Sequence, residues 1–148
     1  MTAVLPNMHT YSAFKQVLAY PMTWGEASTK YCMVRERAPD STAAGYLVQY
    51  EDGYVSWCPK AAFERANVEN GNYSFAHALQ VMLQHKGATA SLTSWNGKGM
   101  YVYWADSFVY EGVCLRGCFV LVRPDGTHQA GWLPSTHDLT TNEWFVEI

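Results

Sequence analysis

A hairpin signal in the first half of the chain constrains the fold more than any other feature. The runs 45–50 and 54–57 are rich in tyrosine, valine and tryptophan, and Glu51-Asp52-Gly53 stands between them. Aromatic and β-branched residues favour strands, and Asp-Gly supplies the positive backbone angles that a tight turn needs. The sequence therefore predicts an antiparallel hairpin here, followed by a helix over 59–66 that opens on a proline.

A second turn signal lies in the other half of the chain. The segment 89–95 carries β-branched and aromatic residues, 100–104 is strongly strand-like, and Asn96-Gly97 stands between them. Asn-Gly is a strong turn dipeptide, so this turn is predicted to join two strands. We expect the following residues, 105–111, to form a loop, and 117–122 to form a further strand.

Helical spacing of apolar residues appears at two further places. The pattern over 11–20 predicts a short amphipathic helix, and Ser74 is suited to cap a second helix over 75–85. Near the C-terminus, Ser135 with an acidic residue three positions later resembles a capped helical turn, and 142–148 alternates as a final strand does. The predicted fold class is α+β, with a small antiparallel sheet and a packed helix, preceded by a small helix and β-hairpin module.

A polar string over 67–72 is the best boundary candidate in the chain. It divides the sequence into an N-terminal hairpin-and-helix module of unknown role, residues 1–70, and a second module, residues 73–148. We expect the first module to dock on the second without forming part of a ligand pocket.

Composition narrows the classes of partner. The chain of 148 residues carries a net charge of −3, and neither half is basic, so we expect no nucleic-acid polymer as partner. No apolar run of 18 or more residues exists, and the N-terminus lacks a basic region followed by an apolar core, so we expect neither a membrane span nor a secretion signal. Cys114 and Cys118 with His128 lack a fourth zinc ligand, so we expect no metal site and free thiols.

The turn at 95–100 carries the most suggestive chemistry. Trp95 offers a flat apolar face, Asn96 a donor and an acceptor, and Lys98 a positive charge, while two nearby glycines let another molecule approach the main chain closely. This mixture suits a planar, polar, anionic ligand such as a nucleotide. The alternative is a plain hairpin turn whose tryptophan packs into the core.

Three function classes follow from these observations. An enzyme needs a nucleophile or an acid–base pair placed by a third group, and the candidates are thin, since His137 and Asp138 are only sequence neighbours and Cys114 lies near no histidine. We therefore expect no enzyme and no cofactor. A nucleotide-binding protein and a phage interaction or virion-associated protein without a small-molecule ligand both remain.

Two motifs resemble a known phage family. The turn Trp95-Asn96-Gly97-Lys98-Gly99-Met100 and the ending Trp132-Leu133-Pro134-Ser135, with Asp138-Leu139 and Glu143-Trp144 after it, are similar to the second type of Thoeris anti-defence protein. The resemblance covers 73–148. It implies a sponge that binds glycocyclic ADP-ribose without cleaving it in the host bacterial cytoplasm, as a homo-oligomer, a tetramer of two dimers, with ligand between protomers. Some relatives also hold cyclic dinucleotides of a second immune system.

The candidate site joins these two motifs. A purine would stack on Trp95, with Tyr101 or Tyr103 as neighbour, and we expect only one of these tyrosines to face the site. Phosphates would meet backbone amides, Lys98 and hydroxyls at a helical N-terminus, whereas Asp138 is a capping residue or a ribose acceptor. The complete set of predicted ligand-binding residues is Trp95, Asn96, Gly97, Lys98, Gly99, Met100, Tyr101, Tyr103, Trp132, Leu133, Pro134, Ser135, Thr136 and Asp138.

Overall fold

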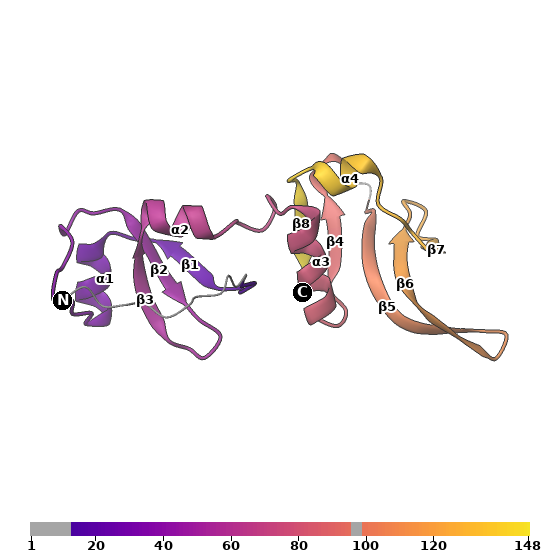
Figure 1. Ribbon diagram of the computed structural model, residues 1–148, viewed down its shortest axis with the longest axis horizontal. Helices are drawn as coiled ribbons and strands as arrows, with labels where there is room; N and C mark the ends of the chain where they lie inside the picture. The colour runs from indigo at the N-terminus through magenta and orange to yellow at the C-terminus, as the bar shows by residue number, and fades with distance from the viewer. Residues whose placement is uncertain (1–12, 96–98) are drawn as a thin grey trace, which may run out of the picture. The chain divides into compact units, whose positions relative to one another are not determined.

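The computed structural model describes residues 13–95 and 99–148 and divides the chain into two compact units (Figure 1). Unit 1 is Met1–Asn67 and unit 2 is Val68–Ile148. The predicted turn residues Asn96, Gly97 and Lys98 lie outside the described residues. Each unit has its own sheet and its own core, so each is described by itself.

Unit 1 is a three-stranded antiparallel sheet with two short helices. The strand order is β1-β2-β3, and Trp57 on β3 stands opposite Leu47 on β2. The hairpin predicted around Asp52-Gly53 is confirmed as the β2–β3 pair. The elements in chain order are β1 (Leu18–Pro21), α1 (Trp24–Tyr31), β2 (Gly45–Gln49), β3 (Val55–Pro59) and α2 (Lys60–Ala66).

The predicted helix over 11–20 is wrong. Residues 13–17 form no regular element, and Leu18 begins strand β1, where it pairs with Gln49 of β2. The helix lies later in the chain, where Thr23 caps α1: the Thr23 hydroxyl accepts the backbone N–H of Glu26 at 3.3 Å, and the Glu26 carboxylate accepts the N–H of Thr23 at 2.9 Å. Residues 18–21 form a strand because they pair with β2. Helical spacing over so few residues is a weak signal, and this pairing overrides it.

The core of unit 1 is built on two tryptophans. Trp24 and Trp57 are buried, with exposed fractions of 5% and 2%, and their rings meet edge to face at 5.5 Å. The indole N–H of Trp57 donates to the carbonyl of Met22 at 2.8 Å, so its polar atom is satisfied. Gly45 lies against this ring, because a β-carbon at that position would stand 2.3 Å from it.

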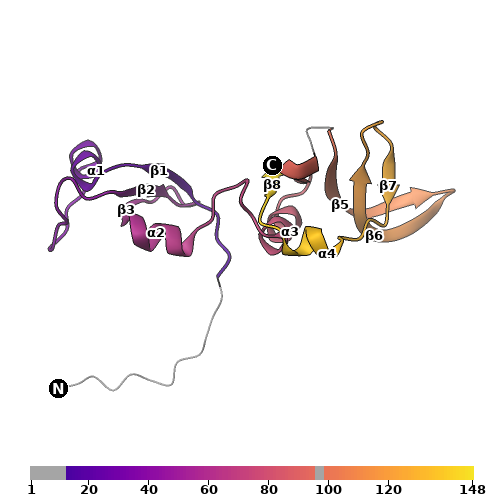
Figure 2. The ribbon, with the colours of Figure 1, turned by 90° about the horizontal axis from the view of Figure 1, so that it is seen from above.

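Unit 2 is a five-stranded antiparallel sheet in the order β7-β6-β5-β4-β8, with α3 and α4 on one face (Figure 2). The strands that flank the predicted turn at 95–100 do pair antiparallel, since Thr89 pairs with Tyr103. In chain order the elements are α3 (Phe75–Gln84), β4 (Thr89–Leu92), the 3₁₀ turn η1 (Thr93–Trp95), β5 (Tyr101–Tyr110), β6 (Val113–Val122), β7 (His128–Ala130), α4 (Thr136–Thr140) and β8 (Trp144–Glu147).

The core of unit 2 lies between α3 and the inner strands. Ala90 pairs with both Val102 and Val146, and all three side chains are buried on the face that α3 covers. Ser74 caps α3 as predicted, its hydroxyl accepting the N–H of His77 at 3.4 Å. Leu83, near the end of α3, is exposed. The α3 residues that are buried are Phe75, Ala78, Val81 and Met82.

The predicted loop over 105–111 is wrong. These residues continue strand β5 as far as Tyr110, which pairs with Val113 of β6. The chain reverses through Glu111 and Gly112, whose φ angles are +48° and +78°. Two central residues with positive φ define the turn whose twist matches a hairpin, so β5 and β6 form one long ribbon.

The predicted fold class, α+β with a small sheet and a packed helix, is confirmed. Unit 2 begins at Val68, and the polar string 67–72 is partly bound into it. The Asn70 side chain donates to the carbonyl of Val146 at 2.6 Å and accepts its N–H at 2.8 Å. Asn70 thereby covers part of the β8 edge, as a neighbouring strand would.

Candidate functional site

Three tryptophans bring the two sequence motifs together. The ring of Trp95, at the start of the turn, lies 6.5 Å from that of Trp132 and 5.6 Å from that of Trp144, measured between centroids. Trp132 and Trp144 are 6.3 Å apart. All three pairs are edge to face, with interplanar angles of 84°, 78° and 74°, the arrangement that the ring quadrupole favours. We call these three residues the tryptophan cluster.

The tryptophan cluster is anchored in the core at one end. The side chain of Trp144 is fully buried, and its indole N–H donates to the carbonyl of Asp138 at 2.8 Å. Phe75 of α3 packs against Trp144 and Trp132, at 5.4 and 6.3 Å between ring centroids. Trp132 is 9% exposed and Trp95 is half-buried, so burial decreases from the core toward the turn.

Aromatic contact also connects the tryptophan cluster to β5 and β6. Phe119 lies 6.2 Å from Trp132, and Trp104 lies 5.1 Å from Phe119. The backbone N–H of Trp132 donates to the carbonyl of Phe119 at 3.0 Å, which fixes the segment before α4 against β6. Sequence reasoning did not single out Phe75, Trp104 or Phe119, because nothing in a single sequence shows which aromatic residues lie side by side.

Ser135 and Asp138 form the capping structure expected of them. The Asp138 carboxylate accepts the N–H of Ser135 at 2.7 Å and its hydroxyl proton at 2.8 Å, and the Ser135 hydroxyl accepts the N–H of Asp138 at 3.2 Å. Asp138 is 9% exposed. Both donors of Ser135 are used within the cap. The hydroxyl of Thr136 is therefore more available than that of Ser135 to bind an anion. The capping prediction for Asp138 is confirmed.

The described end of the turn has the backbone that glycine permits. Gly99 is exposed and has a φ of +69°, a conformation that side-chain-bearing residues rarely adopt, and nothing stands within 4 Å of the position of a β-carbon there. Met100 is half-buried. Leu133, in the second motif, is 84% exposed, and Pro134 after it is half-buried. The main chain of Gly99 is therefore accessible to another molecule.

The expectation that only one of Tyr101 and Tyr103 faces the site is wrong. Residues two apart on a strand share a face, and the two rings lie 6.5 Å apart. Both point to the face opposite Val102 and Trp104. The hydroxyl of Tyr103 lies 2.9 Å from Nδ1 of His128 on β7. Within one chain, the sheet therefore separates these tyrosines from the tryptophan cluster.

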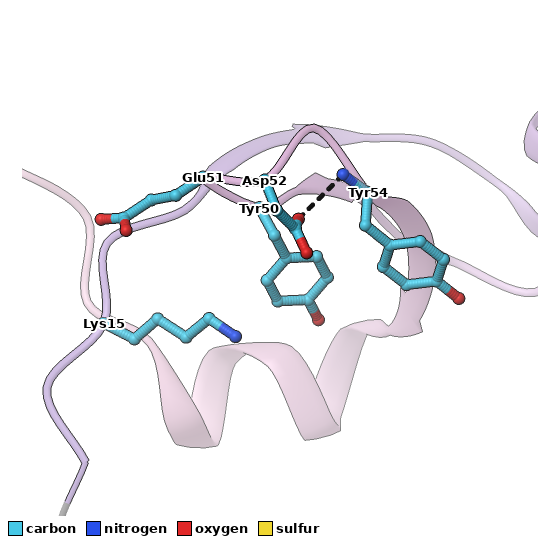
Figure 3. Close-up of a pocket in the computed structure, with 5 residues that line it drawn as sticks. All are labelled: Lys15, Tyr50, Glu51, Asp52 and Tyr54. Carbon is cyan, nitrogen blue, oxygen red and sulfur yellow. Dashed lines mark hydrogen bonds between the residues drawn. The ribbon is translucent and has the colours of Figure 1, made fainter.

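Unit 1 has a hollow of its own, of about 480 Å³, at the tip of the β2–β3 hairpin (Figure 3). Lys15 lies over the ring of Tyr50, with Nζ 4.1 Å from the centroid, and Tyr50 stacks on Tyr54 at 5.9 Å. The Asp52 carboxylate accepts the N–H of Tyr54 at 3.0 Å. Sequence reasoning placed no ligand here. Since Lys15 of the same chain lies over the ring of Tyr50, that aromatic face is already covered.

Neither a metal-binding cluster nor a membrane-spanning helix is found among the described residues. Across residues 13–95 and 99–148, no three histidine, cysteine, aspartate or glutamate side chains gather closely enough to hold a metal ion. The four cysteines are free thiols. Within the same described ranges, no helix is both long and apolar enough to cross a bilayer.

Unit 2 thus defines a class of small α+β domain in which helices cover one sheet face and a tryptophan cluster links a glycine turn to the C-terminal capped helix. The model of the Thoeris anti-defense 2-like domain family matches residues 73–147, and the chain belongs to this family. Its role is accordingly that of a phage anti-defence protein. A search among curated proteins found no match to the chain.

Proposed function

We propose that unit 2 binds and sequesters a cyclic nucleotide immune signal without cleaving it. Glycocyclic ADP-ribose is the first candidate, with cyclic dinucleotides as a second ligand class. The observation that supports this most is the meeting of the two family motifs at the tryptophan cluster, since Trp95 contacts Trp132 directly. A turn and a C-terminal segment 37 residues apart in sequence thereby border one surface.

The chemistry of this surface suits a nucleotide. Trp95 is held by perpendicular contacts with two buried rings and is itself half-buried, so it offers a rigid aromatic surface. Stacking of a base on such a ring is worth about 1–3 kcal/mol. The Gly99 amide, the Lys98 ammonium and the Thr136 hydroxyl supply donors for phosphate oxygens. The Asp138 carboxylate is buried and accepts two hydrogen bonds from Ser135, so it serves the helix cap and is not a phosphate contact.

A binding role without catalysis is part of the proposal. His137 is exposed on α4, and the Asp138 carboxylate beside it accepts hydrogen bonds from Ser135. A general base needs an orienting partner of this kind for itself, and here that carboxylate serves the helix cap instead. We therefore propose that the chain returns its ligand intact.

The proposed binding protein is a homo-oligomer, a tetramer of two dimers, with ligand between protomers. Tyr101 and Tyr103 face away from the tryptophan cluster of their own chain, so a second protomer is what could bring such a face to a shared ligand. Ligand binding at a protomer boundary also couples affinity to assembly.

The experiment that tests the function is ligand recovery. The protein is mixed with glycocyclic ADP-ribose, the unbound nucleotide is separated by filtration and measured, and the protein is then denatured and its contents chromatographed. We expect depletion of free ligand and release of the unchanged molecule. A modified product would instead indicate an enzyme, and undiminished free ligand across cyclic nucleotides would favour a protein interaction role.

A further inference from the structure

The distal half of the β5–β6 hairpin extends past the rest of the sheet (Figure 1). Pairing with β4 reaches along β5 only to Tyr103, and pairing with β7 reaches back along β6 only to Val120. We call residues 107–116 the arm. Among the described strands, each strand of the arm has the other as its sole neighbour. A ribbon of two strands is only marginally stable in water by itself.

The arm exposes apolar side chains that a monomer would leave in water. Val109 is 71% exposed, Tyr110 64%, Val113 59% and Leu115 38%. Phe108 stands opposite Leu115, and Tyr110 stands opposite Val113, so these four side chains share one face. Contiguous exposed apolar surface of this kind marks an interaction site.

The backbone of β6 turns free hydrogen-bonding groups outward along the arm. The hairpin turn sets which groups these are, because Glu111 and Gly112 are its two central residues and Tyr110 and Val113 form the hydrogen-bonded pair that closes it. Backbone direction alternates along a strand, so Val113 and Leu115 turn their N–H and C=O groups toward β5. Cys114 and Arg116 turn theirs outward, as an open sheet edge.

We propose that the arm is a dimer interface, in which β6 pairs antiparallel with β6 of a second copy about a two-fold axis at Leu115. The inference rests on the oligomer in the proposed function and gives it an interface. In this register Leu115 faces its own copy, Cys114 faces Arg116 of the second copy, and Val113 faces Gly117. The register keeps the two arginines apart, and the glycine leaves room beside the valine.

The arm itself favours a second copy as occupant over an unrelated strand. An antiparallel edge is self-complementary, so a two-fold pairing satisfies the same outward groups on both chains and closes without leaving a new edge. In this pairing the apolar faces of the two arms lie side by side on one side of the joined sheet, so the two Leu115 side chains are cross-strand neighbours at the axis. Only one acidic and one basic side chain, Glu111 and Arg116, lie between residues 107 and 116, so assembly brings few charges together.

The first test is the mass of the full chain in solution, measured by light scattering. Leu115→Asp places two carboxylates at the axis, and we expect the mass to fall by half relative to the natural sequence. Leu139→Asp is the matched control, because Leu139 is 51% exposed on α4, away from the arm. One chain mass for the natural sequence, or an unchanged mass for Leu115→Asp, would overturn the proposal.

The second test does not depend on a disruptive variant. Opposite residues on paired strands have β-carbons about 4.5–5.5 Å apart, so Arg116→Cys should form disulfides with Cys114 of the second copy under mild oxidation. We expect a covalent dimer on a non-reducing gel, and none when Cys114→Ser is added. No dimer, or equal cross-linking of the natural sequence through Cys114, would contradict this register.

Ligand recovery by the same variants keeps the two proposals distinguishable. If the natural sequence assembles and Arg116→Cys cross-links as expected, but the natural sequence retains no cyclic nucleotide, the arm interface stands and the sponge function fails. If it retains ligand but Arg116→Cys does not cross-link, the function stands and the arm interface is wrong.

Discussion

Both units build their cores on tryptophan, but the two groups of tryptophans differ in how far they reach toward the surface. In unit 1, Trp24 and Trp57 are both buried and lie 5.5 Å apart, and the guanidinium of Arg35 covers both rings at 5.2 and 5.7 Å. In unit 2, the tryptophan cluster runs from Trp144, fully buried, to Trp95, half-buried beside the glycine turn. One cluster is closed, and the other reaches the surface.

This difference separates a structural cluster from one suited to binding. In unit 1 the indole N–H of Trp57 is hydrogen-bonded inside the core and the guanidinium of Arg35 lies over both rings, so this pair has a structural role. In unit 2 the buried end provides rigidity, and the surface end presents a ring whose orientation is fixed before any ligand arrives. Such pre-organisation lowers the entropy that binding must otherwise overcome.

The largest expected effect comes from removing the buried end of the tryptophan cluster. Trp144→Ala should destabilise unit 2 by about 3–5 kcal/mol, because it leaves a cavity under Phe75 and an unpaired carbonyl at Asp138. Trp57→Ala is the counterpart in unit 1. Calorimetry with amide NMR should show loss of one unit's structure in each variant. Equal loss of both units in either variant would contradict the independence of the two cores.

The next effect concerns the surface end. Trp95→Ala should weaken glycocyclic ADP-ribose binding by one to two powers of ten, at about 1.4 kcal/mol per decade, while the oligomer stays intact. Titration calorimetry measures the dissociation constant, and circular dichroism checks the fold. If this variant unfolds the protein and Lys98→Ala leaves the affinity unchanged, Trp95 serves the core and the turn is only a turn.

A smaller effect is expected from the capped helix. Asp138→Ala should cost about 0.5–2 kcal/mol, since it removes the carboxylate that accepts both donors of Ser135. Urea unfolding would measure the change, with Leu139→Ala on the same helix as control. Because the carbonyl of Asp138 accepts the indole N–H of Trp144 in the tryptophan cluster, ligand affinity should fall with it. Loss of stability with unchanged affinity would separate the cap from the binding surface.

The smallest effect belongs to the exposed cap of unit 1. The backbone N–H and the hydroxyl of Thr23 hold the pKa of Glu26 below its ordinary value. A lowered pKa in the folded state means that this contribution is present at neutral pH and is lost as the pH falls through the folded pKa. Thr23→Ala should therefore raise the pKa of Glu26 in an NMR titration and leave ligand binding unchanged. An unaltered pKa would show that the cap does not persist in solution.

Elements with a strong local signal were predictable. The β2–β3 hairpin, the capped helix α3 and the capped turn at Ser135 all follow from residues within a few positions of one another. The helix predicted over 11–20 was wrong because Leu18 pairs with Gln49, a partner far along the chain. The loop predicted over 105–111 was wrong because glutamate is rare at positive φ, so Glu111-Gly112 did not indicate a hairpin turn.

The candidate site was predictable as two motifs but not as one surface. Trp95 and Trp132 were both named from the sequence, yet only the fold shows that their rings touch. Phe75 and Phe119, which complete the aromatic contacts, carry no local signal because their role depends on which strands and helices adjoin. The common face of Tyr101 and Tyr103, in contrast, was predictable from the sequence, because residues two apart on a strand point to the same side.

The central claim is that ligand binds at the surface end of the tryptophan cluster in unit 2. Its most direct test is the set of six tryptophan indole N–H signals in a ¹H–¹⁵N NMR spectrum during addition of glycocyclic ADP-ribose. The signals of Trp95 and Trp132 should shift and saturate, whereas those of Trp24 and Trp57 should stay in place. Shifts confined to Trp24 and Trp57, or no shift at any indole, would contradict the account.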